Sequence, residues 1–319
     1  MTMEQTVVMT GASRGIGRTA ARHLASRPGM HLVLLSRTTP QALVDELRAA
    51  GGSVTVIRAD LSSLRSVSEA ADEVVELVLS GRLPPIGALV CNAGVQHANA
   101  LSRTVDEFEA TVAVNVLANH VLLRKLQDHL EFGARIVVTV SDTHFGDLRH
   151  NLGMVPGPQW RPVETLARVA AFPTPSSSSA GRTAYSTSKL AAIYLVHEYA
   201  RRPPAGLTIT SFNPGFVPGT DLARDADAVS RFAMRRIMPL LSLTPLATSP
   251  DRAGRFLADA VLGTASAPSG AYIDRDRVAA SSPESYDRQR ERGAWEAVEA
   301  LTARFLPSAA DPNPGRENR

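Results

Sequence analysis

The chain has 319 residues, of which 44% are hydrophobic, and this is enough to bury a sizeable core. Its formal net charge is +3, and its arginines are scattered without a basic run beside aromatic residues, so we expect no nucleic-acid partner. No apolar run is long enough to cross a membrane, and the first residues show no signal-peptide pattern, so we expect no integral membrane segment. A single cysteine, Cys91, excludes an internal disulfide framework and is typical of a cytoplasmic protein.

Short apolar segments rich in β-branched residues alternate with longer helical patterns along the chain. The predicted strands are Thr6–Thr10, Met30–Leu35, Ser53–Arg58, Ile86–Cys91, Ala134–Val140 and Leu207–Phe212. Strands that alternate with helices indicate βαβ units and a parallel sheet buried on both faces. We therefore predict an α/β fold: a Rossmann-like, doubly wound parallel sheet in a single domain over residues 1–306, with an inserted loop and a small substrate cap.

Two regions interrupt this alternation. Residues 143–182 carry five prolines and four consecutive serines, which predicts an inserted loop that is functional or partly disordered. Residues 219–250 include "AVSRFAMRRIMPLL", an amphipathic pattern that predicts a substrate lid or, alternatively, a membrane-surface anchor. Further on, a capped helix is expected to pack Trp295, Val298 and Leu301, and residues 307–319 are expected to form a flexible tail.

The stretch "TGASRGIGRTAARHLAS" follows the first predicted strand and opens a helix. Gly11, Gly15 and Gly17 lie in this turn, where side chains would block the approach of a phosphate. The helix N-terminus adds unpaired amides and a positive dipole end. A glycine-rich turn can be no more than a tight turn, but its position between strand and helix favours nucleotide binding.

The second predicted strand indicates which dinucleotide binds. It ends in Ser36 and Arg37 with no acidic residue, and Arg14 within the glycine turn is a second cation. A carboxylate there would bind the ribose hydroxyls of NAD, whereas arginines can bind the 2′-phosphate of NADP through bidentate hydrogen bonds. Both arginines could simply be exposed, but the pattern predicts NADP(H) as the cofactor.

The motifs "TGASRGIG", "CNAG", "YSTSK" and "NPG", together with Asn115 and Ser141, occur in the order typical of the short-chain dehydrogenase/reductase family. The chain resembles this family over about residues 6 to 275. The resemblance implies a dinucleotide-binding oxidoreductase in which Asn115, Ser141, Tyr185 and Lys189 are catalytic.

Tyr185 and Lys189 are one helical turn apart, and Lys189 is one of only two lysines. Reduction of a carbonyl needs an acid that protonates the developing alkoxide, and a free phenol with a pKa of about 10 is too weak near neutrality. A nearby ammonium favours the phenolate, so we expect Lys189 to lower the pKa of Tyr185. Tyr185 would then be the general acid in reduction and the base in oxidation, and the resemblance implies that Lys189 also binds the nicotinamide ribose.

Ser141 ends a predicted strand at the edge where parallel sheets bind ligands, so its hydroxyl is expected to stabilise the substrate oxyanion. Asn115 lies among apolar helix positions. It can be a buried asparagine satisfied within the core, or, as the resemblance implies, it holds a water that relays protons to Lys189.

The resemblance also predicts the remaining cofactor contacts. Asp60 would meet the adenine, although it could equally cap a helix, and the NPG segment would line the nicotinamide carboxamide. The predicted cofactor-binding residues are Gly11, Ser13, Arg14, Gly15, Ile16, Gly17, Ser36, Arg37, Asp60, Leu61, Asn92, Ala93, Gly94, Tyr185, Lys189, Pro214, Gly215, Val217 and Thr220. Cys91 is expected to be a small buried filler, His144 an exposed loop residue rather than a substrate contact, and no metal site is predicted.

The long interval between Ser141 and Tyr185 and the segment "NPGFVPGTDLAR" resemble the retinol dehydrogenase and protochlorophyllide reductase branch. This resemblance implies a bulky, lipophilic small-molecule substrate, and the family at large includes homodimers. We expect interconversion of a carbonyl and an alcohol. One alternative is reduction of a carbon–carbon double bond, but the photosynthetic enzymes that catalyse it carry additional cysteines, whereas this chain has only Cys91. The other alternative is that the chain is a non-catalytic NADP(H)-binding regulatory protein.

Overall fold

The computed structural model describes residues 4–151, 153–202, 206–217, 248–264 and 266–306. The predicted amphipathic helix between residues 219 and 250, the predicted contact Thr220 and the predicted tail lie outside these residues. The substrate lid and the membrane-surface alternative therefore stay predictions.

The centre of the molecule is an eight-stranded sheet with the order β3-β2-β1-β4-β5-β6-β7-β8. The strands are β1 (Gln5–Thr10), β2 (Met30–Ser36), β3 (Ser53–Arg58), β4 (Ile86–Cys91), β5 (Leu130–Thr139), β6 (Thr208–Asn213), β7 (Tyr272–Asp274) and β8 (Arg277–Ala279). The first seven are parallel to their neighbours, and only β8 runs antiparallel to β7. The order reverses between β1 and β4, which is where doubly wound sheets bind ligands at their carboxyl edge.

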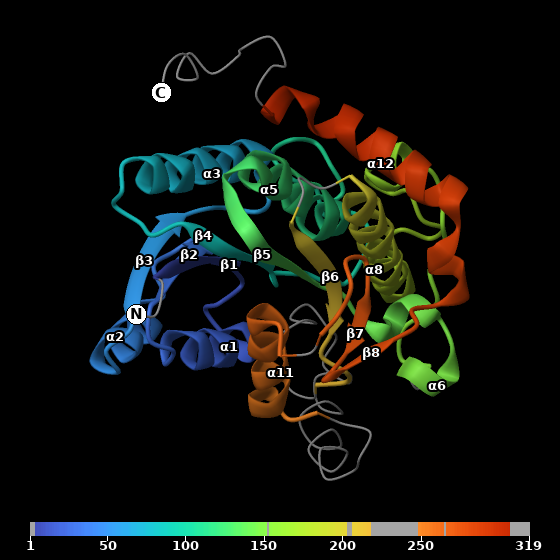
Figure 1. Cartoon of the computed structure of the whole chain (residues 1–319). Helices are drawn as coiled ribbons and strands as arrows, with labels where there is room; N and C mark the ends of the chain where they lie inside the picture. The colour runs from blue at the N-terminus through green and yellow to red at the C-terminus, as the bar shows by residue number, and fades with distance from the viewer. Residues whose placement is uncertain (1–3, 152, 203–205, 218–247, 265, 307–319) are drawn as a thin grey trace.

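Helices cover both faces of this sheet (Figure 1). They are α1 (Gly15–Ala25), α2 (Gln41–Ala49), α3 (Leu64–Leu79), α4 (Ala110–Val112), α5 (Ala118–Leu126), α6 (Leu148–Asn151), α7 (Val163–Leu166), α8 (Ser178–Arg201), α11 (Pro250–Leu262) and α12 (Arg288–Thr302). One face carries α1, α2 and α11, the other α3, α5 and α8 (Figure 1). Each face has its own apolar core, so the predicted doubly wound α/β fold is confirmed.

All six predicted strands are present, with ends that differ by a few residues. The strands β7 and β8 were not predicted from the sequence. Each has only three residues, too few for a period-two pattern to be visible.

The predicted inserted loop over residues 143–182 has secondary structure in its described residues, so it is not a structureless connection, and its functional role stays a prediction. It contains α6 and α7 and buries Val163, Leu166 and Phe172. The Trp160 ring packs edge-on against Tyr194 of α8 with 4.7 Å between ring centroids. The run of serines does not extend the loop either, because Ser177 caps α8 by accepting a hydrogen bond from the Ala180 amide.

The predicted C-terminal helix is confirmed as α12, which Asp287 caps and which packs across α8 (Figure 1). Val298 is fully buried, and Trp295 packs edge-on against Tyr199 of α8. The buried carboxylate of Glu291 accepts a 2.7 Å hydrogen bond from His197. Apolar packing and this polar pair together fix α12 on α8.

Within the ranges described above, none of the helices combines the length and the apolar character that crossing a bilayer requires.

Candidate active site

One cavity of about 1340 Å³ opens at the carboxyl edge of the sheet. Almost every predicted site residue that the structure describes lines it. These residues are Gly11, Ser13, Arg14, Gly15, Ile16, Gly17, Ser36, Arg37, Asp60, Leu61, Asn92, Ala93, Gly94, Ser141, Tyr185, Lys189, Pro214, Gly215 and Val217. Asn115 does not line the cavity. Motifs spread over some two hundred residues of sequence thus converge because parallel strands end at the same edge.

The glycine turn connects β1 to α1 and forms one end of the cavity. Gly11 and Gly15 have φ of +69° and +54°, a conformation that favours glycine. A Cβ on Gly17 would lie 2.1 Å from the Gly11 carbonyl oxygen, whereas a Cβ on Gly15 would have open space around it. Gly17 is therefore required for packing, and Gly15 for its backbone conformation beside the space that a pyrophosphate would need.

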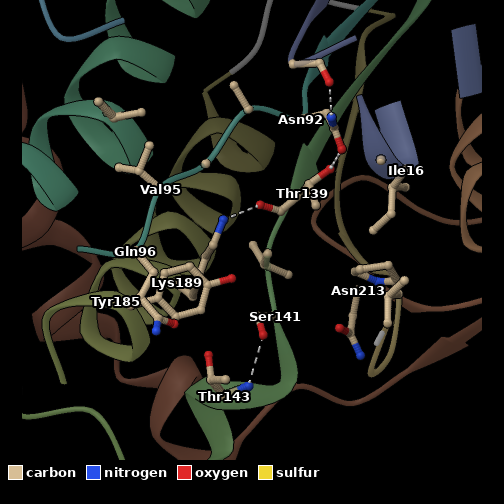
Figure 2. Close-up of a pocket in the computed structure, with 18 of the residues that line it drawn as sticks. Ile16, Asn92, Val95, Gln96, Thr139, Ser141, Thr143, Tyr185, Lys189 and Asn213 are labelled. Atoms are coloured by element: carbon tan, nitrogen blue, oxygen red, sulfur yellow. Dashed lines mark hydrogen bonds between the residues drawn. The ribbon is translucent and has the colours of Figure 1, made fainter. Parts of the chain in front are cut away.

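The segment after β4 holds the glycine turn in place. The Asn92 side chain donates a 3.1 Å hydrogen bond to the Gly11 carbonyl and accepts one of 3.2 Å from Thr139 of β5. The Thr10 hydroxyl accepts from the amides of Asn92 and Ala93. Three neighbouring strand ends are thereby fixed relative to one another (Figure 2).

Tyr185 and Lys189 lie on α8 and point into the same space as Ser141, which follows β5 (Figure 2). The Lys189 ammonium lies 5.5 Å from the centroid of the Tyr185 ring and donates a 2.9 Å hydrogen bond to the Thr139 carbonyl. The Ser141 hydroxyl accepts from the Thr143 amide at 3.3 Å. A phenol, an ammonium and a hydroxyl donor are thus grouped at the end of the cavity opposite the glycine turn.

The pKa values in this group follow from burial. Burial raises the pKa of Tyr185, and the Ser141 hydroxyl only partly offsets this by hydrogen bonding. Asp142 raises the pKa of Tyr185 further, and Lys189 is not among the groups that shift it, so the expected lowering by Lys189 is not found. Burial also lowers the pKa of Lys189 to about 8, so Lys189 is still mainly charged at neutral pH.

Asn115 lies behind this group, in a π-helical turn (Ala113–Leu117) that joins α4 to α5. Its side chain donates to the Val95 carbonyl and the Ser188 hydroxyl, each at 3.0 Å, and accepts from the Val95 amide. These bonds fix the segment after β4 against α8. They also satisfy the Asn115 side-chain amide, as expected for a buried asparagine that is satisfied within the core. π-Helical turns are frequent at functional sites, but a water relay to Lys189 stays a prediction.

Three other expectations meet different outcomes. Cys91 is fully buried, as predicted, and burial raises the pKa of its thiol to about 12. Asp60 does not cap α3, because Ser63 is the capping residue. The Asp60 carboxylate instead accepts hydrogen bonds from the amide and the hydroxyl of Ser62. His144 is 1% exposed, so its prediction as an exposed loop residue was wrong, and burial lowers its pKa to about 4.

The short chain dehydrogenase family profile matches residues 5–150. Protochlorophyllide reductase B, chloroplastic, of Hordeum vulgare is 30% identical over 318 residues, which cover 92% of this chain and 78% of the relative. A protein of Streptomyces sp. (strain C5) named "Putative daunorubicin C-13 ketoreductase" is 33% identical over 304 residues, which cover 93% and 92% of the two chains. This chain belongs to the short-chain dehydrogenase/reductase family.

The solved structures agree with this assignment. A short chain dehydrogenase from Burkholderia cenocepacia in complex with NADP is 26% identical, with a TM-score of 0.59 and coverage of 86% of this chain and 97% of that one. The predicted family is therefore confirmed, and the match to a protochlorophyllide reductase supports the predicted branch.

Several residues that line the cavity of this short-chain dehydrogenase/reductase were not predicted from the sequence. They include Asp142, Phe145, His150, Tyr272 and Asp274. Asp142 lies three residues after the end of β5, and this position near a strand end was a usable signal, whereas His150 lies in α6. Tyr272 and Asp274 form the strand that the sequence did not reveal.

No group of three or more histidine, cysteine or acidic side chains that could hold a metal ion occurs in the part of the chain that the structure describes.

Replacement of Gly17 by alanine is expected to weaken NADPH binding at least about tenfold, because the new Cβ would lie 2.1 Å from the Gly11 carbonyl and displace the turn. Fluorescence titration with NADPH measures this effect. Gly293→Ala is the matched control, since its Cβ on α12 would meet no atom within 4 Å. The control should keep its NADPH affinity and gain up to about 1 kcal/mol of stability. Equal NADPH affinity in both variants would contradict the role of Gly17.

Proposed function

We propose that this protein is an NADP(H)-dependent oxidoreductase that interconverts a carbonyl and an alcohol on a bulky, lipophilic small molecule. The observation that carries the proposal is the grouping of Ser141, Tyr185 and Lys189 in one cavity with the glycine turn. General acid–base groups must lie within hydrogen-bond reach of the atom that they protonate. Ser141 and Tyr185 border the same space, which supports binding of one substrate oxygen by both hydroxyls.

When bound, the nicotinamide supplies the hydride that reduces the carbonyl carbon. The chain's own residues handle the oxygen. The Ser141 hydroxyl donates a hydrogen bond to the carbonyl oxygen, and Tyr185 donates its proton as negative charge develops there. The raised pKa of Tyr185 keeps the phenol protonated before this step. Lys189 then stabilises the phenolate that remains, since its ammonium lies 5.5 Å from the ring centroid.

The residues at the other end of the cavity fit a phosphorylated dinucleotide. Gly15 borders open space at the N-terminus of α1, where amides favour a pyrophosphate. Ser36 and Arg37 line the cavity at the end of β2, and no carboxylate follows that strand directly. The NADP complex of the Burkholderia cenocepacia relative supports the same cofactor here.

Reversal of the Arg37 charge tests the cofactor assignment. Arg37→Glu is expected to raise the KM for NADPH by about 10- to 100-fold and to change that for NADH much less, because a carboxylate repels the 2′-phosphate. Steady-state kinetics with both cofactors measures this. Arg27→Glu makes the same charge change at an exposed position that does not line the cavity, and it should leave both values unchanged. A similar rise for NADPH and NADH would argue against contact with the 2′-phosphate.

The size and lining of the cavity support a bulky substrate. A volume of about 1340 Å³ exceeds the roughly 300–1,000 Å³ typical of small-molecule sites, so it has room for a dinucleotide and a second molecule. Phe145, Met154, Val155 and Phe216 supply apolar surface to this space. The relatives named for protochlorophyllide and daunorubicin agree with a large substrate.

The second candidate function is reduction of a carbon–carbon double bond, which the 30% identity to protochlorophyllide reductases favours. Chalcone, a bulky ketone conjugated to a double bond, separates the two. Carbonyl reduction with NADPH gives 1,3-diphenylprop-2-en-1-ol, whereas double-bond reduction gives dihydrochalcone. We expect the alcohol as the first product, identified by chromatography. Dihydrochalcone as the first product would instead establish the alternative.

A further inference from the structure

A polar cluster lines the cavity beside Ser141. Its members lie within or directly after β6 and β7 or shortly after β5, and they are Asp142, Asn213, Tyr272, Asp274 and Arg275. The Asp142 amide donates to the Asn213 side chain at 3.2 Å, and the Asn213 amide group donates to Asp274 at 3.0 Å. The cluster is therefore held together by bonds between neighbouring strand ends. The proposed chemistry above uses none of these side chains.

Tyr272 has an unsatisfied hydroxyl in this cluster. Tyr272 lines the cavity although the residue is only 3% exposed. Among the described residues, its buried oxygen makes no hydrogen bond of 3.5 Å or less, although the Asn213 side chain lies close enough to affect its pKa. The rings of His144 and Phe145 pack beside it, at 5.3 and 6.3 Å between centroids. A buried hydroxyl without a partner is costly, and native structures seldom keep one unless a ligand or water satisfies it.

Asp142 adds a carboxylate without an ion pair. Among the described residues, no lysine, arginine or histidine nitrogen lies within 4.0 Å of it, and its one side-chain hydrogen bond is a long one, 3.4 Å from the Ser141 hydroxyl. Burial and the neighbouring Asp274 raise its pKa to about 6, so it is still mainly ionised at neutral pH. Burial raises the pKa of Tyr272, the negative charges of Asp142 and Asp274 raise it further, and Arg275 and the Asn213 side chain partly oppose this, so these groups share one electrostatic environment.

This carboxylate is unfavourable for the proposed chemistry when nothing pairs with it. Its charge raises the pKa of Tyr185 and opposes negative charge on a substrate oxygen that Ser141 holds. A hydrogen-bond donor on the substrate would remove this conflict by binding the carboxylate. Because Asp142 lies 3.4 Å from the Ser141 hydroxyl, a donor on the carbon next to the reacting carbonyl would lie within reach of the carboxylate.

We propose that Asp142 and Tyr272 form a subsite that binds a hydroxyl or protonated amine on the carbon adjacent to the reacting carbonyl of the substrate. The subsite makes the protein selective for ketones that carry such a donor. This inference rests on the proposed function, because it places the donor relative to the carbonyl that Ser141 and Tyr185 bind.

Binding to the NADPH-loaded Tyr185→Phe protein tests the subsite without turnover. Benzoin and deoxybenzoin are matched bulky ketones that differ by one hydroxyl next to the carbonyl, and 2-amino-1,2-diphenylethanone replaces that hydroxyl with an amine. We expect calorimetry to show that benzoin or the amine binds about tenfold more tightly than deoxybenzoin, as one hydrogen bond to a charged group allows. The more tightly bound of the two identifies the donor.

Asp142→Asn and Tyr272→Phe, each added to this background, should reduce the preference to about twofold or less without changing deoxybenzoin binding. Asp147→Asn is the control, because this exposed carboxylate of the same segment does not line the cavity. Equal binding of the three ketones, binding of none, or a preference that survives both variants would overturn the subsite. If the preference is present but the unmodified enzyme oxidises no NADPH with any of them, the proposed function fails and the subsite stands.

Discussion

The Tyr185→Phe variant is expected to lose about a thousandfold in kcat/KM for ketone reduction while it binds NADPH within about twofold of the unmodified protein. Loss of the hydroxyl removes the proton donor from a site that otherwise keeps its shape, because the ring stays buried in the same cavity wall. Stopped-flow measurement of NADPH oxidation and fluorescence titration of NADPH give the two quantities independently.

Tyr194→Phe is the matched control. Tyr194 lies on the same helix and is fully buried, but its hydroxyl donates to the Glu284 carbonyl at 3.0 Å outside the cavity. This variant should lose about 1 kcal/mol of stability and keep its activity. Full activity in Tyr185→Phe would indicate a different proton donor, whereas absence of turnover in the unmodified protein would support the alternative of a non-catalytic binding protein.

Lys189→Met has the second large expected effect. We expect kcat/KM to fall by about a hundredfold or more, because the phenolate of Tyr185 loses its nearby cation. We also expect no loss of stability at pH 7, since an uncharged side chain of similar length removes the cost of burying the ammonium. Urea unfolding together with kinetics separates the two effects.

The pH dependence of stability gives Lys189→Met a further signature. The folded-state pKa of Lys189 is about 8, against an ordinary value of 10.5. The burial cost is therefore fully present below about pH 8 and disappears by about pH 10.5, because the unfolded chain keeps its proton longer. The unmodified protein should gain stability relative to the variant over this range. The other lysine, at position 125, is the control, and Lys125→Met should leave kcat/KM unchanged, since Lys125 pairs with Asp72 away from the cavity. A stability difference that is constant from pH 8 to pH 10.5 would contradict the buried ammonium.

The shared location of residues at strand ends could be predicted from the sequence, because parallel strands end at the same edge of the sheet whatever the conformation of the loops. Gly11, Asn92 and Ser141 follow three different strands, and all three line one cavity. Tyr185 and Lys189 do not follow a strand. They could be predicted because the motifs occur in the order typical of the family and because the two residues are spaced by one turn of a helix, α8, that does form.

Long-range contacts decided what the sequence could not predict. His144 is buried among residues distant in the sequence: the Tyr272 ring packs beside it, and the amide of Ser282, 138 residues away, donates to its ring. Tyr272 belongs to a strand of three residues that pairs with β6 on one side and β8 on the other. The direction of the pKa shift of Tyr185 depends on the depth of burial, which a local spacing of tyrosine and lysine does not encode.

Hydride transfer from labelled cofactor tests the central claim most directly. NADPH carrying deuterium on one or the other face of nicotinamide C4 is mixed with the enzyme and deoxybenzoin, and the product is examined by mass spectrometry. The account predicts that one of the two labelled cofactors, and not the other, places deuterium on the carbinol carbon, and that Tyr185→Phe binds the same cofactor but transfers almost none. Product without deuterium from either cofactor, or unchanged transfer by Tyr185→Phe, would contradict it.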